Sequence, residues 1–242
     1  MSTPDSLKGR EVILTGGSGG IGAALAAQLR DEAARLVISY RANRDRAAQW
    51  EGSAAVIQAD LTSVADRTRL LDAAPSLYAL VVFAGDPARV ADPSQLEAAM
   101  QRSHDANYLG PILLAREAAE RMRASSTPGA IVLISTMQAN ALFPGSTVYA
   151  AQKAALQHAA LILARECRGA SNIRVNVVSP GITAAGMAEA SIASRKYDRF
   201  LQDGTLARFG RAEDVARAVR FFLEPDNYVT GQVLCVDGGI TL

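Results

Sequence analysis

Short apolar runs rich in β-branched residues alternate along this chain with longer, alanine-rich stretches. Apolar runs of this kind are typical of strands buried on both faces, and their alternation with helices is the pattern of a parallel sheet covered by helices. Seven strands with helices between them predict a single doubly wound α/β domain over residues 1–242. The predicted strands are Glu11–Thr15, Leu36–Tyr40, Ala54–Gln58, Leu80–Phe83, Ala130–Ser135, Arg174–Val178 and Val233–Val236.

The composition fits a soluble globular protein and excludes several other classes. Of the 242 residues, 49% are hydrophobic and 20% charged, and the net charge of +1 creates no field that favours nucleic acid or an anionic membrane. Residues 1–10 contain no signal-peptide core and no apolar run has the length of a membrane span, so we expect a cytoplasmic protein. Cys167 and Cys235 lack the spacing of a disulfide framework or a metal site, and we expect two buried thiols and no bound metal.

The helical stretches include two long ones and one weakly periodic segment. Pro111 predicts a bend or break near Gly110 in the stretch from Leu96 to Met122. The stretch from Tyr149 to Arg168 predicts one unbroken helix. Residues 183–210 contain three glycines and mixed charge between two well-defined elements, which predicts a mobile lid.

A glycine-rich turn follows the first strand directly, with the sequence Thr15-Gly16-Gly17-Ser18-Gly19-Gly20-Ile21-Gly22. Glycine permits positive φ and close backbone approach, and the following helix N-terminus offers unpaired N–H groups and partial positive charge. Between a strand and a helix, such a turn predicts a site for the diphosphate of a dinucleotide, lined by Gly16, Ser18, Gly19, Gly20, Ile21 and Gly22. The alternative is a flexible loop without a ligand.

The end of the second strand reads Ser39-Tyr40-Arg41-Ala42-Asn43-Arg44 and has no carboxylate. A carboxylate at this place would bind the ribose hydroxyls of NAD, whereas arginine accommodates the 2′-phosphate of NADP. Tyr40, Arg41 and Arg44 therefore predict a preference for NADP(H). The alternative is that the two arginines only solvate the start of a helix.

Tyr149 and Lys153 are four residues apart in a helical stretch and share one helix face. Alone, the same spacing is also typical of two side chains that only contact each other on a helix surface. Its context is more specific, because a strand ends at Ser135-Thr136 and a loop leads from Thr136 to Tyr149.

These motifs together resemble the classical short-chain dehydrogenases/reductases, and most closely the 3-oxoacyl-carrier-protein reductase-like subgroup. Order and spacing match from about Leu7 to Gly239. The motifs are Thr15-Gly16-x3-Gly20-x-Gly22, Asp60-Leu61, Asn107, Tyr149-x3-Lys153, Pro180-Gly181 and Gly231-Gln232-Val233-Leu234-x-Val236-Asp237-Gly238-Gly239. The resemblance implies a Rossmann-type sheet of seven parallel strands flanked by helices.

The resemblance also implies roles for single residues. Tyr149 would donate the proton to a carbonyl oxygen, and Lys153 would bind the nicotinamide ribose and, with the nicotinamide charge, lower the Tyr149 pKa. Asn107 would hold a water in a proton relay, with a helix-kink residue as the alternative. The other implied cofactor contacts are Asp60 and Leu61 at the adenine, Ala84 and Gly85 after the fourth strand, and Pro180, Gly181, Ile182 and Thr183 along the nicotinamide, with transfer of the pro-S hydride. Asp60 also fits a helix-capping turn residue.

Three positions depart from the family pattern. Thr136 replaces the usual serine, which keeps the hydroxyl but adds a methyl, and we prefer it to Ser135 because neighbouring residues of a strand point to opposite faces. Val82-Phe83 replaces two asparagines and predicts a more apolar floor near the adenosine. Ala185 occupies the place of a threonine that contacts the nicotinamide amide, and Thr183 is the nearest substitute.

The sequence therefore predicts an NADP(H)-dependent reductase of a small-molecule ketone or a 3-oxoacyl thioester, free or carrier-bound, acting as a homotetramer or homodimer. The substrate would be selected by residues 138–147, by Met187 and by residues 188–205. Two alternatives stay open: a catalytically weak nucleotide-binding regulator on the same fold, and a non-redox accessory protein of a biosynthetic pathway such as a dehydratase partner.

Overall fold

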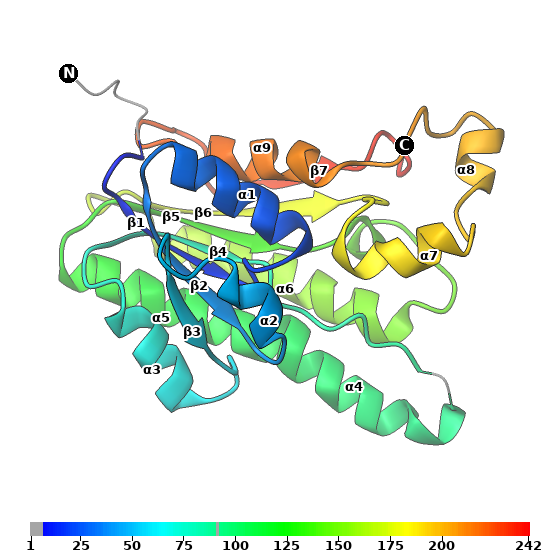
Figure 1. The fold of residues 1–242 in the computed structure, drawn as a ribbon, viewed down its shortest axis with the longest axis horizontal. Helices are drawn as coiled ribbons and strands as arrows, with labels where there is room; N and C mark the ends of the chain where they lie inside the picture. Colours follow the sequence, from blue (N-terminus) through cyan, green and yellow to red (C-terminus); the bar gives the residue numbers. More distant parts are fainter. Residues whose placement is uncertain (1–6, 91) are drawn as a thin grey trace.

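Seven parallel strands form one sheet with helices on both faces (Figure 1). This computed structural model describes residues 7–90 and 92–242. The strands are β1 (Glu11–Thr15), β2 (Arg35–Tyr40), β3 (Ala55–Gln58), β4 (Leu77–Val82), β5 (Gly129–Ile134), β6 (Ile173–Pro180) and β7 (Val233–Val236). The α-helices are α1 (Gly20–Asp31), α2 (Arg44–Ala48), α3 (Val64–Asp72), α4 (Leu96–His104), α5 (Gly110–Ala124), α6 (Thr147–Glu166), α7 (Glu189–Ala193), α8 (Arg199–Gln202) and α9 (Ala212–Phe222).

The strand order β3-β2-β1-β4-β5-β6-β7 confirms the predicted doubly wound sheet. The predicted bounds of the first and last strands are those observed. The fourth strand begins at Leu77 rather than Leu80, because Leu77, Tyr78 and Ala79 are buried as well and extend the pairing with β1. The order reverses at β1, which pairs with both β2 and β4, and a ligand crevice forms at such a reversal outside the carboxyl ends of the strands.

Two apolar layers hold the helices on the sheet. On one face, Leu25 of α1 and Val219 of α9 pack against the strands, and on the other Leu114 of α5 and Leu163 of α6 do so. Figure 1 shows α1 and α9 above the sheet and α3, α5 and α6 below it. Each buried leucine or valine contributes about 1.5–3 kcal/mol, so the crevice stands on a rigid support.

The interruption predicted near Gly110 is a π-helical turn, Asp105–Leu109, between α4 and α5. Gly110 donates its N–H to the Asp105 carbonyl five residues back. Pro111 lies in the first turn of α5 and lacks the N–H that an α-helix would give to the Asn107 carbonyl. The proline therefore sets the place of the interruption although the irregular turn lies before it.

The prediction of two buried thiols is right for Cys167 and wrong for Cys235, which is exposed. Cys235 lies on β7, and this edge strand has a neighbour on one side only.

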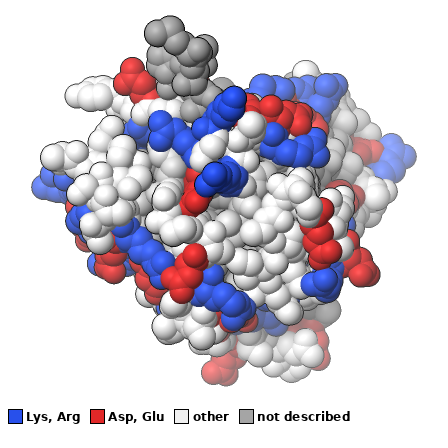
Figure 2. All heavy atoms as spheres, turned by 60° about the vertical axis from the view of Figure 1, so that its left-hand side comes forward, with Lys and Arg blue, Asp and Glu red and all other residues white. Residues whose placement is uncertain are grey.

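On the face drawn in Figure 2, basic and acidic side chains are interspersed. Among the described residues, no helix has the length and apolarity of a membrane span. Residues 1–6, part of the segment without a signal-peptide core, lie outside the described residues.

Candidate active site

The carboxyl ends of the strands open into one cavity of about 1630 Å³. Sites for small ligands usually measure roughly 300–1,000 Å³, so this cavity has room for a dinucleotide and a second molecule. Its walls follow the ends of β1 to β6. The predicted site residues that line it are Gly16, Ser18, Gly19, Gly20, Ile21, Gly22, Tyr40, Arg41, Asp60, Leu61, Ala84, Gly85, Thr136, Tyr149, Lys153, Pro180, Gly181, Ile182 and Thr183.

The glycine-rich turn has the geometry of an anion cradle. Gly16 and Gly20 have φ of 68° and 53°, which glycine adopts without strain. A Cβ on Gly22 would lie 2.6 Å from the Gly16 carbonyl oxygen, so only glycine lets the helix start this close to the strand. No side chain caps the N-terminus of α1, and its first turn contains no carboxylate. Its N–H groups and partial positive charge therefore suit a diphosphate.

The two arginines predicted for the 2′-phosphate lie in different surroundings. Arg41 lines the cavity, whereas Arg44 does not and instead forms an ion pair of 2.9 Å with Glu51. Arg46, two residues further along the chain, lines the cavity instead. It lies against Gly19, because a Cβ added to this glycine would be 2.6 Å from the Arg46 Cδ. The prediction missed Arg46 because two residues on a helix are about 200° apart, and the start of α2 decides which one faces inward.

Asp60 and Leu61 are held at the cavity wall by a buried arginine that sequence reasoning missed. The Asp60 carboxylate accepts hydrogen bonds from the Thr62 N–H and hydroxyl, which hold the pKa of this carboxyl below its usual range. Asp60 thus forms a turn with Thr62 and lines the cavity, but it does not cap α3, because the capping residue is Ser63. Arg67, 3% exposed, donates to the Leu61 carbonyl at 2.8 Å and pairs with Glu117 of α5 at 2.9 Å. These bonds fix the segment after β3 to the neighbouring helix.

Tyr149, Lys153 and Thr136 come together at one wall of the cavity. Tyr149 and Thr136 both line the cavity, and the Thr136 side chain is close enough to the Tyr149 phenol to lower its pKa. Lys153 is 2% exposed, and its Nζ donates to the Ile134 carbonyl at 2.8 Å. The Ser135 Oγ instead donates to the Lys153 backbone carbonyl. The hydroxyl beside Tyr149 is therefore that of Thr136 and not that of Ser135.

Burial perturbs both titrating groups of this cluster. It raises the pKa of Tyr149 to about 12, against a smaller lowering by the hydrogen bond with Thr136. It lowers the pKa of Lys153 to about 8. The expected lowering of the Tyr149 pKa is therefore not produced by the protein alone, because desolvation of the phenolate is the larger effect. At neutral pH the phenol is protonated and can act as a proton donor.

Asn107 is fully buried and does not line the cavity. Its Oδ1 accepts from the Asp86 N–H at 3.0 Å and its Nδ2 donates to the Asp86 carbonyl at 2.9 Å. The π-helical turn thus fixes the loop after β4. The Asp86 carboxylate lies 4.0 Å from Arg41 and 3.3 Å from Arg102, which also lines the cavity. Nothing in the pattern of α4 marks Arg102 as a cavity residue.

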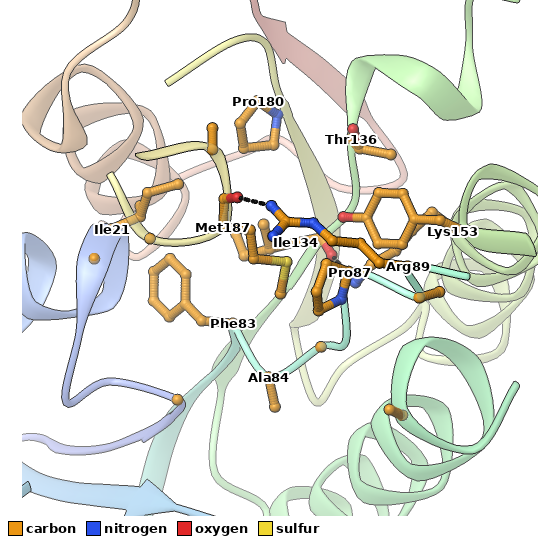
Figure 3. Close-up of a pocket in the computed structure, with 18 of the residues that line it drawn as sticks. Ile21, Phe83, Ala84, Pro87, Arg89, Ile134, Thr136, Lys153, Pro180 and Met187 are labelled. Atoms are coloured by element: carbon orange, nitrogen blue, oxygen red, sulfur yellow. Dashed lines mark hydrogen bonds between the residues drawn. The ribbon is translucent and has the colours of Figure 1, made fainter. Parts of the chain in front are cut away.

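The departures from the family pattern have unequal structural effects. Val82 is buried in β4, whereas the Phe83 ring points into the cavity near Ile21 and Met187 (Figure 3). The cavity wall is thus more apolar at one of the two positions. Thr183 is buried and its hydroxyl donates to the Gly181 carbonyl at 3.2 Å.

Residues 183–210 contain a 3₁₀ turn (Gly186–Ala188), α7 and α8. A Cβ on Gly20 would lie 3.1 Å from the Gly186 Cα, so this segment lies against the glycine-rich turn. Arg89, from the loop after β4, donates to the Met187 carbonyl at 2.9 Å across the cavity (Figure 3). The segment is thereby joined to two walls of the cavity.

Comparison with known proteins agrees with this geometry. Residues 16–241 match the family model described as enoyl-(acyl carrier protein) reductase. An uncharacterized oxidoreductase of Methylorubrum extorquens is 34% identical, over 97% of this chain and 98% of its own. The chloroplastic NADPH-dependent aldehyde reductase 2 of Arabidopsis thaliana is 30% identical, over 100% of this chain and 97% of its own.

A short-chain type dehydrogenase/reductase from Mycobacterium ulcerans has a similar structure, with a TM-score of 0.89 and 29% identity over 98% of this chain and 91% of that one. Family model, relatives and fold therefore agree with the motifs in the sequence. This chain belongs to the short-chain dehydrogenases/reductases, a family of oxidoreductases that bind a nicotinamide cofactor.

Proposed function

We propose that this protein reduces a carbonyl compound to an alcohol with NADPH and that Tyr149 donates the proton. The observation that carries the proposal is that the Tyr149 phenol, the Thr136 hydroxyl and Lys153 line one cavity wall, with Tyr149 and Lys153 one turn apart on α6. The similarity to an NADPH-dependent aldehyde reductase supports the same class of reaction.

The protein's own groups act on the carbonyl oxygen. The chemistry that NADPH would supply, when held in the cavity, is a hydride for the carbonyl carbon. Tyr149 gives its proton to the oxygen, and the Thr136 hydroxyl donates a hydrogen bond to the same oxygen as negative charge develops there. Lys153 lies one turn from Tyr149 on α6, and its positive charge would stabilise the phenolate that remains. The carbonyl gains one hydride and one proton, which makes an alcohol.

We assign the walls of the cavity to the parts of the cofactor. Residues 16–22 and the start of α1 hold the diphosphate. Arg41 and Arg46 hold the 2′-phosphate, and Asp60 lies at the adenine. Residues 180–182 lie along the nicotinamide, while residues 183–210 form a lid over the reacting groups.

We also propose that the chain assembles into a homotetramer or homodimer through α6 and β7. Ile162 on α6 and Leu234 on β7 are 47% and 38% exposed, which is high for large apolar side chains on regular elements. Sedimentation velocity at micromolar concentration checks this proposal. A single monomeric species would contradict it.

The Tyr149→Phe variant tests the mechanism. Loss of a general acid lowers kcat roughly 10²–10⁴-fold, whereas NADPH binding should stay intact because the ring is kept. Turnover is followed by the absorbance of reduced nicotinamide with a panel of ketones and aldehydes. Tyr228→Phe is the matched control, since Tyr228 is fully exposed and lies outside the cavity. Unchanged turnover in Tyr149→Phe contradicts the mechanism, and tight NADPH binding without turnover of any carbonyl by the wild type would indicate a regulator.

A further inference from the structure

Basic residues gather at the lid end of the cavity. Arg89 lines it from the loop after β4, and Lys196 and Arg199 line it from the lid. The only carboxylates among the described lining residues are those of Asp60 and Asp105. Both lie at the end of the cavity opposite the lid. Asp60 follows β3, and Asp105 belongs to the π-helical turn. Gly110, which follows this turn, packs on Leu61 beside Asp60.

The cavity cations differ from other basic residues of the same region in their pairing. Arg195 pairs with Asp198, and Arg208 pairs with Asp214. Arg89, Lys196 and Arg199 have no carboxylate within 4.0 Å among the residues that the structure describes. At the lid end, Arg195 and Arg208, which do not line the cavity, are thus neutralised by the chain, whereas Arg89, Lys196 and Arg199, which line it, are not.

Aromatic rings lie directly beside two of these cations. The Lys196 Nζ is 5.6 Å from the Tyr197 ring centroid, and the Arg199 Cζ is 4.6 Å from that of Phe200. Both rings line the cavity and pack on a small buried cluster that contains Leu206. This wall therefore offers an apolar surface that ends in positive charge.

Arg89 retains free donors although it contacts the lid. Its Nη2 donates to the Met187 carbonyl, and a guanidinium has five N–H donors in all. Figure 3 shows its guanidinium in the same opening as Thr136 and Lys153. A planar guanidinium with free N–H groups is suited to bind a carboxylate or phosphate with two hydrogen bonds.

We propose that the substrate carries an anionic group, a carboxylate or a phosphate, at the end remote from its carbonyl, and that Arg89, Lys196 and Arg199 bind it. An apolar segment between the two ends packs on Tyr197 and Phe200. This inference rests on the proposed carbonyl reduction and names the substrate class of that site.

Paired substrates test the inference. Short- and medium-chain oxo acids are compared with their methyl esters, and a 3-oxoacyl-CoA with the N-acetylcysteamine thioester of the same acid. At least one anionic member should have a kcat/KM about tenfold above its neutral partner, the size of one charge-assisted hydrogen bond. The first pair reports a carboxylate and the second a phosphate. The preference should shrink with added salt, since screening weakens exposed charge pairs.

Arg89→Gln and Arg199→Gln should lower kcat/KM for the preferred anion about tenfold more than for its neutral partner. Arg195→Gln is the matched control on the lid, because Arg195 is paired with Asp198 and does not line the cavity. Equal kcat/KM for both members of every pair, or equal losses in the variants, overturns the inference.

Failure of the proposed reduction has a different signature, because then neither member of any pair is turned over. In that case calorimetric titration of the wild-type protein with each acid and its ester, with and without NADP⁺, decides the inference alone. Tighter binding of the acid supports the anion site, and equal binding of both overturns it.

Discussion

Replacing Arg46 by glutamine separates the contributions of two neighbouring arginines to cofactor choice. Both belong to α2, but only Arg46 lines the cavity, and it lies against Gly19 of the diphosphate turn. Arg44 points away and pairs with Glu51. Because NADPH and NADH differ only in the 2′-phosphate, a residue that binds this group should affect one cofactor and not the other.

The size of the effect follows from the surroundings of Arg46. A hydrogen bond to a charged group contributes about 1.5–3 kcal/mol, which is roughly 10–150-fold in affinity. Arg46 is exposed and its charge is screened, so the lower end applies. We expect Arg46→Gln to lower kcat/KM for NADPH about 10–30-fold and to leave that for NADH within about twofold.

Steady-state rates at saturating carbonyl substrate measure the ratio of kcat/KM for the two cofactors. Arg44→Gln is the matched control and should leave the ratio unchanged, and Arg46→Lys should retain part of it. The assignment is refuted by an equal fall of the ratio in Arg44→Gln, or by equal losses of NADPH and NADH turnover in Arg46→Gln.

Three further changes test the buried groups around the site. The pKa of Lys153 is about 8 in the folded protein and 10.5 ordinarily. Its contribution to the free energy of unfolding is therefore fully present above pH 10.5 and is lost as the pH falls through 8. Urea unfolding should show the stability of the wild type relative to Lys153→Met rising by about 3 kcal/mol over that window, and a flat difference would refute this. Arg67→Met leaves Glu117 and two carbonyls unpaired and should cost about 3 kcal/mol in the same assay, with a loss under about 1 kcal/mol as the contrary result. Thr136→Val should lower kcat about 10–100-fold while Thr136→Ser retains it, since only valine removes the hydroxyl beside Tyr149; equal rates in both would exclude a role for this hydroxyl.

The strands and the glycine-rich turn were predictable because each depends on local properties of the chain. A strand between two helical layers is apolar on both faces, so it stands out in the sequence whatever surrounds it. The turn needs glycine at Gly16, Gly20 and Gly22 for backbone reasons that are equally local. Cys235 shows where this reasoning ends, because an apolar run on an edge strand looks the same as one in the middle of the sheet.

Side chains whose role depends on helix phase or distant contacts were not predictable. The Asn43 side chain caps α2 by accepting a hydrogen bond from the Arg46 N–H at 2.9 Å. The residue at which α2 begins decides which arginine faces the cavity, and here it is Arg46 and not Arg44. Arg67 pairs with Glu117, which is fifty residues away along the chain. The sequence around either residue contains no pattern that predicts this pair. The lid packs on Met137, which is contributed by the segment after β5, and this contact is between parts of the chain that are distant in sequence.

The loop after β4 connects the two ends of the cavity, and one buried amide holds it. Asn107 binds both backbone groups of Asp86, whose carboxylate lies near Arg41 at the end of the cavity that we propose for the adenosine. Three residues further, Arg89 contacts Met187 of the lid. The cofactor end and the lid end therefore share one short stretch of backbone, and its position is set by a side chain that does not line the cavity. The asparagine of this π-helical turn therefore has a structural role, because its amide binds the loop while the chain continues as a helix into α5.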